Sequence, residues 1–149
     1  MLWRCCGSTR WVQRMLARRP FRSRELMLAA AREEWFALSP SDWLEAFSHH
    51  PKIGDRGALQ ERFAATRDFS EREQSGVNAA SGEVLAALAE RNREYERRFG
   101  FIFIVCASGR SAHEMLGMLE ARLTNGATRE IQLAAEEQMK ITELRLLGL

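Results

Sequence analysis

The chain has 149 residues, of which 46% are hydrophobic and 28% are charged, and this balance is typical of an ordinary globular domain. The basic residues number 22 and the acidic residues 20, so the formal net charge is +2. No apolar run is long enough for a membrane-spanning helix, and the first residues lack the apolar stretch of a secretory signal. We therefore expect one cytoplasmic domain over residues 1–149, with no membrane partner.

Almost all the basic residues are arginines, which by itself would suit nucleic acid because each phosphate contact needs a fixed cation. Acidic residues are interleaved with them, however, as in residues 32–34, 71–73 and 94–98. Such alternation is typical of solvated helix faces carrying pairs of opposite charge. The sequence therefore predicts no nucleic-acid partner.

Cysteine and histidine spacing gives no sign of a metal site. Cys5, Cys6 and Cys106 form no C-x-x-C motif, so neither a zinc site nor a disulfide framework is predicted. Reduced thiols fit a cytosolic compartment. His49 and His50 are adjacent, and neighbouring residues do not share a helix face, so a pair of metal ligands is not expected.

Helical periodicity dominates the chain. Hydrophobic residues recur at steps of three and four. Ser or Ser-Pro precedes several of these stretches, with Ser23 and Ser111 as predicted caps, and Gly or Asn-Gly follows others, with Gly100 as a predicted end. In the last stretch Ile131, Ala134, Ala135, Ile141 and Leu144 are expected to face inward. We therefore expect an all-α fold, a single compact multi-helix domain. The predicted helices cover residues 11–18, 23–36, 40–48, 58–66, 70–99, 111–124 and the end of the chain from 128.

Residues 101–107 are the exception to this helical pattern. They form an unbroken run of mainly aromatic and β-branched residues, which locally is typical of a buried strand. One strand cannot make a sheet, so we expect an extended buried crossing within a helical domain. Its backbone polar groups then need partners, and a bound polar ligand could supply them.

Three side chains are candidates for chemistry, and each has a structural alternative. His50 has a side chain that titrates near neutrality, but it could simply bond a free carbonyl at a helix end. Glu73 stands at the third position of a capping box that Ser70 begins, where its carboxylate would reach back to the Ser70 amide. Arg122 would by default be a surface cation near a helix C-terminus. The residues alone leave these alternatives open.

Five short segments form an ordered series of motifs along nearly the whole chain. They are residues 50–55, 70–76, 92–103, 119–130 and 141–146. In order, they resemble the HPxIGD, S-x-x-EQ-x-G, N-x-x-Y…FGFxF, L-x-x-RL-x-N…E and I-x-x-LRL motifs of one family. That family is the 2-oxo-4-hydroxy-4-carboxy-5-ureidoimidazoline (OHCU) decarboxylases.

The resemblance implies an all-helical, cofactor-free decarboxylase, a homodimer, that converts the ureidoimidazoline substrate OHCU into (S)-allantoin at the end of urate breakdown to allantoin. It implies His50, rather than His49, as the catalytic acid and base, and Glu73 as the second catalytic side chain. No metal is implied. The substrate-binding residues that it implies are Pro51, Ser70, Glu71, Arg72, Glu73, Gln74, Phe103, Ile104, Val105, Cys106, Ala107 and Arg122.

The chemistry of this reaction agrees with those residue types. One ring carbon of the substrate carries a hydroxyl and a carboxylate, and the neighbouring carbon belongs to a C=N bond that accepts the electron pair when CO2 leaves. No cofactor is therefore needed as an electron sink. A histidine suits the proton transfers, a carboxylate beside it could orient the ring, and an arginine offers a planar fork for substrate oxygens.

Two alternative interpretations place the chain in a functional class other than enzymes. The chain could be an inactive helical module whose apolar stripes are buried against a partner protein, or an arginine-based nucleic-acid binder. For a homodimer contact, the apolar end of the chain is the candidate, with Leu144, Leu146, Leu147 and Leu149.

Overall fold

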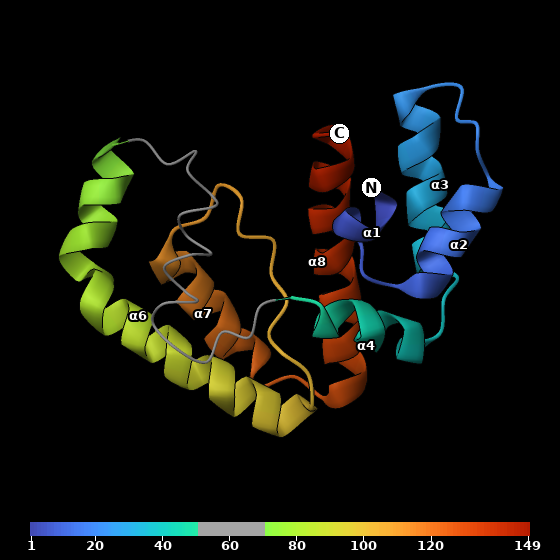
Figure 1. Cartoon of the computed structure of the whole chain (residues 1–149). Helices are drawn as coiled ribbons and strands as arrows, with labels where there is room; N and C mark the ends of the chain where they lie inside the picture. The colour runs from blue at the N-terminus through green and yellow to red at the C-terminus, as the bar shows by residue number, and fades with distance from the viewer. Residues whose placement is uncertain (51–70) are drawn as a thin grey trace. The chain divides into compact units, whose positions relative to one another are not determined.

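The computed structural model describes the backbone of residues 1–50 and 71–149 and the side chains of residues 1–50 and 82–149. Within these ranges every regular element is an α-helix (Figure 1), which confirms the all-α fold. No helix there is long and apolar enough to cross a membrane. The helix expected over residues 58–66 lies outside the described residues. The helices are α1 (Leu2–Cys5), α2 (Thr9–Ala17), α3 (Arg24–Phe36), α4 (Pro40–Ser48), α6 (Glu71–Phe99), α7 (Ala112–Arg122) and α8 (Ala127–Leu147).

Serine caps set the beginnings of three helices. The side chain of Ser8 accepts from the Trp11 amide at 3.4 Å, so α2 begins two residues before the predicted position. Ser23 and Ser111 cap α3 and α7 in the same way, each accepting at 3.1 Å from the amide three residues later. These caps were predicted. Helix α1 was not, because four residues are too few to show a period.

The chain divides into two compact units. We call residues 1–50 and 131–149 the terminal unit, because it combines the two ends of the chain. We call residues 51–130 the central unit. The expectation of one domain over residues 1–149 stays a prediction.

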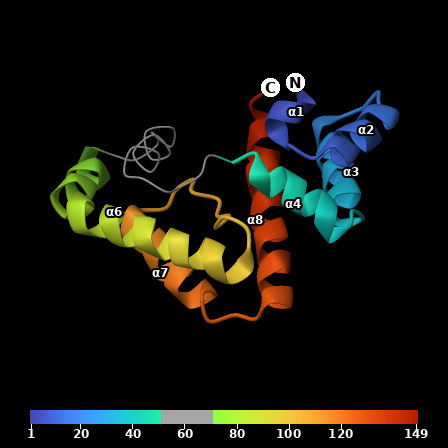
Figure 2. The same ribbon diagram turned by 60° about the horizontal axis from the view of Figure 1, so that its bottom comes forward.

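Tryptophans hold the terminal unit together. The Trp11 indole N–H donates to the Ala31 carbonyl at 3.1 Å, which ties α2 to α3. The Trp35 indole N–H donates to the Ala135 carbonyl at 2.9 Å, which ties α3 to α8. Both indoles are almost fully buried. Helix α1 lies beside the end of α8 in both views (Figures 1 and 2), where Arg145 donates to main-chain carbonyls of α1.

In the central unit, α6 and α7 pack side by side (Figure 2). Tyr95 of α6 is at the centre of their core, with its ring centroid 4.6 Å from that of Phe99 and 5.4 Å from that of Phe103. Helix α6 ends at Phe99, and Gly100 has φ of +81°, a left-handed conformation that glycine adopts without strain. This end was predicted. Leu85, Leu88, Ala89, Val105, Ala112, Met115 and Leu119 complete the core.

The inward face of α8 differs from the predicted one. Ala134 and Ala135 are buried as predicted, but Leu144 is 48% exposed, so the expectation that it faces inward is wrong. Helical steps from Ala135 lead instead to positions 138, 142 and 146, whose side chains are 2% exposed or less. Two of these positions, Gln138 and Thr142, are polar.

Candidate active site

His50 follows the C-terminal end of α4 in the terminal unit. Its main-chain N–H donates to the Phe47 carbonyl at 3.2 Å, which continues the last turn of the helix. Only 8% of the residue is exposed. A free carbonyl at the helix end is therefore satisfied by the His50 backbone, and the imidazole has a different partner.

That partner is the buried amide of Gln138 in α8. The Nε2 atom of His50 is 2.5 Å from the Gln138 Oε1 atom. The Gln138 Nε2 atom donates to the Thr142 hydroxyl oxygen at 3.2 Å, and the same hydroxyl donates to the Gln138 main-chain carbonyl at 2.9 Å. These three residues form a buried polar row in the terminal unit, of which the sequence indicated only His50.

Cys6 lies at the far end of this row. Burial, the largest effect, raises the pKa of its thiol to about 12, and the contacts with the Ser8 main chain and the Thr142 side chain act in the opposite direction. Cys5, Cys6 and Cys106 are all free thiols. Because its pKa is raised, the Cys6 thiol stays protonated, and a protonated thiol is a poor nucleophile. Cys6 therefore packs against the polar row.

His49 has different surroundings from its neighbour. Its ring packs edge-on against Trp3, with 4.9 Å between ring centroids. A Cβ atom added to Gly7 would lie 2.7 Å from the His49 ring, so glycine is needed where the chain passes His49. The His49 side chain thus contacts the N-terminal segment.

Arg122 is buried in the central unit, with 7% of the residue exposed. The default expectation of a surface cation is therefore wrong. Its Nε atom donates to Glu130 Oε1 at 2.5 Å, Nη1 donates to the Ile104 carbonyl at 2.5 Å, and Nη2 donates to the Tyr95 hydroxyl at 3.3 Å. Its guanidinium also lies 4.6 Å from the centroid of the Phe103 ring. A buried charge is tolerated here because it is paired and hydrogen-bonded.

Glu130 is the anion that balances this arginine. It is fully buried, and besides Arg122 it accepts from the Tyr95 hydroxyl at 2.6 Å and from the Asn125 amide at 3.1 Å. Burial raises the pKa of Tyr95 above its ordinary value, and the bond with Glu130 acts in the same direction. The Tyr95 hydroxyl therefore keeps its proton and donates it in a hydrogen bond to Glu130.

The segment from 101 to 107 forms neither a helix nor a strand and is largely buried, as expected of a buried crossing. Phe103, Ile104 and Val105 are buried, whereas Cys106 and Ala107 are half-buried. A bound ligand was one candidate partner for its backbone, but the Ile104 carbonyl accepts from Arg122. The protein itself therefore satisfies at least this polar group.

The structure brings Arg122 together with Phe103 and Ile104, all in the central unit. It does not test the remaining predicted site residues. Pro51 and Ser70 lie outside the described residues, and Glu71, Arg72, Glu73 and Gln74 lie in the first turn of α6, with side chains that also fall outside the described part.

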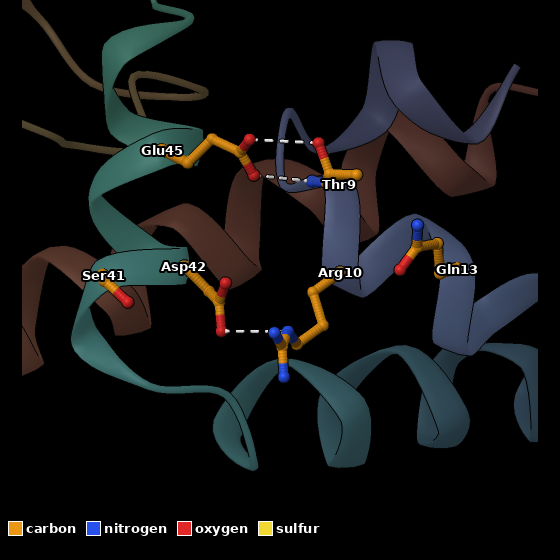
Figure 3. A pocket seen from close by; sticks show the side chains of 6 residues that line it. All are labelled: Thr9, Arg10, Gln13, Ser41, Asp42 and Glu45. Atoms are coloured by element: carbon orange, nitrogen blue, oxygen red, sulfur yellow. Dashed lines mark hydrogen bonds and ion pairs between the residues drawn. The ribbon is translucent and has the colours of Figure 1, made fainter.

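A surface hollow of about 260 Å³ lies between α2 and α4 (Figure 3). Figure 3 shows Glu45 and Thr9 pointing toward each other, with the carboxylate accepting from the Thr9 amide at 2.7 Å and from its hydroxyl at 3.0 Å. Arg10 forms an ion pair with Asp42 at 3.7 Å. The hollow contains none of the predicted site residues, and its polar groups tie the two helices together.

Gln138 and Thr142 are the polar residues of the candidate site that sequence reasoning missed. A signal was present, because the two are four residues apart on the stripe that also carries Ala135 and Leu146. Polar residues on an inward stripe need buried partners. The spacing could therefore have marked this pair, although not its partner.

Comparison with known proteins agrees with the motifs. The family model described as OHCU decarboxylase matches residues 1–147. The "Uric acid degradation bifunctional protein TTL" of Arabidopsis thaliana is 44% identical over 147 residues, which cover 95% of this chain and 44% of that protein. The OHCU decarboxylase of Amia calva is 34% identical over 97 residues, which cover 65% of this chain and 55% of that protein.

A solved structure extends the likeness to the fold. The crystal structure of an OHCU decarboxylase in the presence of (S)-allantoin matches with a TM-score of 0.78 and 41% identity, covering 98% of this chain and 94% of that one. The chain therefore belongs to the OHCU decarboxylase family, as the motifs indicated. It spans about half the length of the two curated relatives above.

Proposed function

We propose that this chain decarboxylates OHCU to (S)-allantoin without a cofactor, the last step in the degradation of urate to allantoin. The observation that carries the proposal is the match over nearly the whole chain to an OHCU decarboxylase whose structure was determined with (S)-allantoin. The family match over residues 1–147 supports the same activity.

The reaction needs little beyond positioning and proton transfer. The bond between the ring carbon and the carboxylate breaks, CO2 leaves, and the electron pair moves toward the neighbouring C=N bond. The ring nitrogen of that C=N bond takes up one proton. Loss of the hydroxyl proton gives the ring carbonyl, and delivery of a proton to the neighbouring carbon on one face sets the S configuration, so the reaction consumes one proton overall. General acid–base catalysis of such transfers is worth about 10²–10⁴-fold.

His50 is the proposed acid and base, because its side chain can hold or release a proton near neutrality. It is held by Gln138 rather than exposed to solvent. Glu73 is the proposed second catalytic group, which orients the substrate together with Gln74. Pro51, Ser70, Glu71 and Arg72 are proposed substrate contacts on the strength of the motifs.

The backbone of residues 103–107 is proposed to bind the ureido and ring amides of the substrate. Arg122 fixes one carbonyl of this segment, which would keep its neighbours in place for a ligand. A guanidinium has five N–H donors, and the protein bonds described for Arg122 use three of them. Arg122 is thus proposed both to shape the segment and to offer its outer N–H groups to a substrate oxygen.

The chain is further proposed to act as a cytoplasmic homodimer. Leu144, Leu147 and Leu149 are each at least 41% exposed and could be buried in a dimer contact. Leu146 is 2% exposed, so it packs within its own chain and is withdrawn from the proposed contact. Light scattering on the purified protein measures the oligomeric state directly.

The activity is tested by circular dichroism of allantoin formed from freshly generated OHCU. The wild type is expected to form the S enantiomer faster than the substrate decays, and His50→Ala is expected to lower the rate by at least about 100-fold. His49→Ala is the matched control and should retain the activity, because His49 packs against Trp3 and Gly7. An inactive wild type would refute the proposal, and an active His50→Ala variant would refute the role of His50.

A further inference from the structure

The buried contact between His50 and Gln138 carries information about the proton on the imidazole. Gln138 is 1% exposed, and its Oε1 atom is 2.5 Å from His50 Nε2. A side-chain amide has one end that only accepts hydrogen bonds and one that only donates. The amide end that faces the ring therefore decides whether Nε2 must carry a proton.

Thr142 decides which way the amide points. A threonine hydroxyl has a single proton to donate, and this one is directed at the Gln138 main-chain carbonyl, 2.9 Å away. The hydroxyl oxygen can then only accept from Gln138, whose amide nitrogen is 3.2 Å away. The sulfur of Cys6 is a weak acceptor and competes poorly with a carbonyl for the same proton. The NH2 end of Gln138 thus faces Thr142, and the oxygen faces His50.

We propose that Gln138, oriented by Thr142, holds neutral His50 in the tautomer with the proton on Nε2 and the lone pair on Nδ1. The same bond persists when the ring is protonated, because Nε2 carries a hydrogen in both charge states. The proton that His50 gains and loses is then the one on Nδ1. Gln138 is a positioning residue for the decarboxylation, a role that rests on the proposed function.

A neutral amide suits this task better than a carboxylate would. A carboxylate at the same place would favour the charged imidazolium by Coulomb attraction, and less of the ring would then be in the neutral form that can accept a proton. An amide oxygen fixes the ring plane and the tautomer without adding charge. Acid–base catalysis is sensitive to such placement, since a misplacement of about 1 Å can reduce a rate by about 10²-fold.

Nitrogen NMR of the whole protein labelled with ¹⁵N-histidine tests the tautomer without reference to activity. The chain has three histidines, so His49→Gln and His113→Gln variants assign the signals. Above the titration of His50, its Nε2 is expected to be the protonated nitrogen. In Gln138→Leu, the His50 signals should move toward those of a ring exchanging between both tautomers. A bare Nε2 in the wild type, or unchanged signals in Gln138→Leu, would overturn the proposal.

A pair of threonine variants separates positioning from a general loss of packing. Thr142→Ser keeps the hydroxyl and should keep the wild-type ring signals, whereas Thr142→Val has a similar shape without the hydroxyl and should shift them. If Gln138→Leu does not fold, this pair still decides the question. Equal ring signals in the two threonine variants would contradict the role given to the hydroxyl.

Kinetics test the link to the reaction. Gln138→Leu and Thr142→Val are expected to lower kcat by about 10-fold or more, with KM changed much less, whereas Thr142→Ser stays near the wild type. Unchanged kcat in Gln138→Leu would overturn the positioning role. If the wild type fails to decarboxylate OHCU, the proposed function fails, and the NMR experiment still decides the tautomer.

Discussion

At the scale of single residues, the buried carboxylate of Glu130 governs the state of its neighbours. One oxygen accepts from Arg122 and from the Tyr95 hydroxyl, and the other accepts from Asn125. Removing one partner of a buried ion pair costs about 3–5 kcal/mol, because the remaining charge stays in a poorly solvating interior. An ionised Tyr95 oxygen would face the Glu130 carboxylate at 2.6 Å. The arrangement therefore requires that the Tyr95 hydroxyl keep its proton.

The pKa of Tyr95 gives this cluster a measurable dependence on pH. Burial, aided by Glu130, raises it above the ordinary value of 10.0. As the pH rises past 10.0, the unfolded chain loses the phenol proton while the folded chain retains it, so the free energy of unfolding falls. The contribution is fully present below this pH and is lost as the pH rises toward the higher folded pKa.

The chain has a single tyrosine, so the ultraviolet absorbance of tyrosinate reports on Tyr95 alone. In an alkaline titration we expect tyrosinate to appear together with unfolding and not before it. Tyr95→Phe should lose about 1–3 kcal/mol at neutral pH and should be less sensitive to alkali than the wild type. Tyrosinate formation with an ordinary pKa in the folded protein would contradict the buried donor.

At the scale of secondary-structure elements, caps and glycines determine where helices begin and end, and they affect how stable the helices are. Helix α7 begins at a Ser111 cap but has Gly117 in its interior, where glycine lowers helix stability. A Cβ atom added to Gly117 would meet nothing within 4 Å. Gly100, in contrast, has a left-handed conformation after α6.

Alanine at these two glycines should therefore have opposite effects. Gly117→Ala is expected to raise the free energy of unfolding by about 0.5–1 kcal/mol, since it removes backbone entropy from the unfolded chain. Gly100→Ala is expected to lower it by about 1 kcal/mol or more, because a side chain is strained at positive φ. Urea denaturation of the two variants and the wild type measures both. A loss of stability in Gly117→Ala would reveal a contact on that face of α7.

At the scale of the whole molecule, the two ends of the chain share one unit, residues 1–50 and 131–149. Trp35 links them, because its indole N–H bonds to the Ala135 carbonyl in α8. Arg145 adds hydrogen bonds to the carbonyls of Arg4 and Cys5. The terminal unit therefore requires the last helix, and α4, which leads to His50, is built on the same framework.

Replacing Trp35 with phenylalanine tests this link. Trp35→Phe removes the bond to Ala135 and leaves a space in the core, with an expected loss of about 2–4 kcal/mol in the free energy of unfolding. Trp3→Phe is the comparison, since Trp3 is 44% exposed, and it should cost about 0.5 kcal/mol or less. Thermal and urea unfolding measure both. Equal losses in the two variants would contradict the central role of Trp35.

The helical fold could be read from the sequence because its signals are local. Ser23, Ser111 and Gly100 acted where they were expected, since caps and stops depend on a few neighbouring residues. Helix α1 was not predicted because a single helical turn is too short to show a hydrophobic period. The inward position of Leu144 was wrong because tertiary packing selected a stripe containing polar residues.

The sequence by itself determined the all-helical architecture, the buried non-helical segment at 101–107 and the motifs of the OHCU decarboxylase family. Each of these features depends only on the order and spacing of residues that are close together in the chain. Only the tertiary structure decided that Arg122 is buried against Glu130 and that His50 bonds Gln138, 88 positions away in the chain. The physical reason is that a buried polar group takes its partner from whatever folding brings within hydrogen-bond distance.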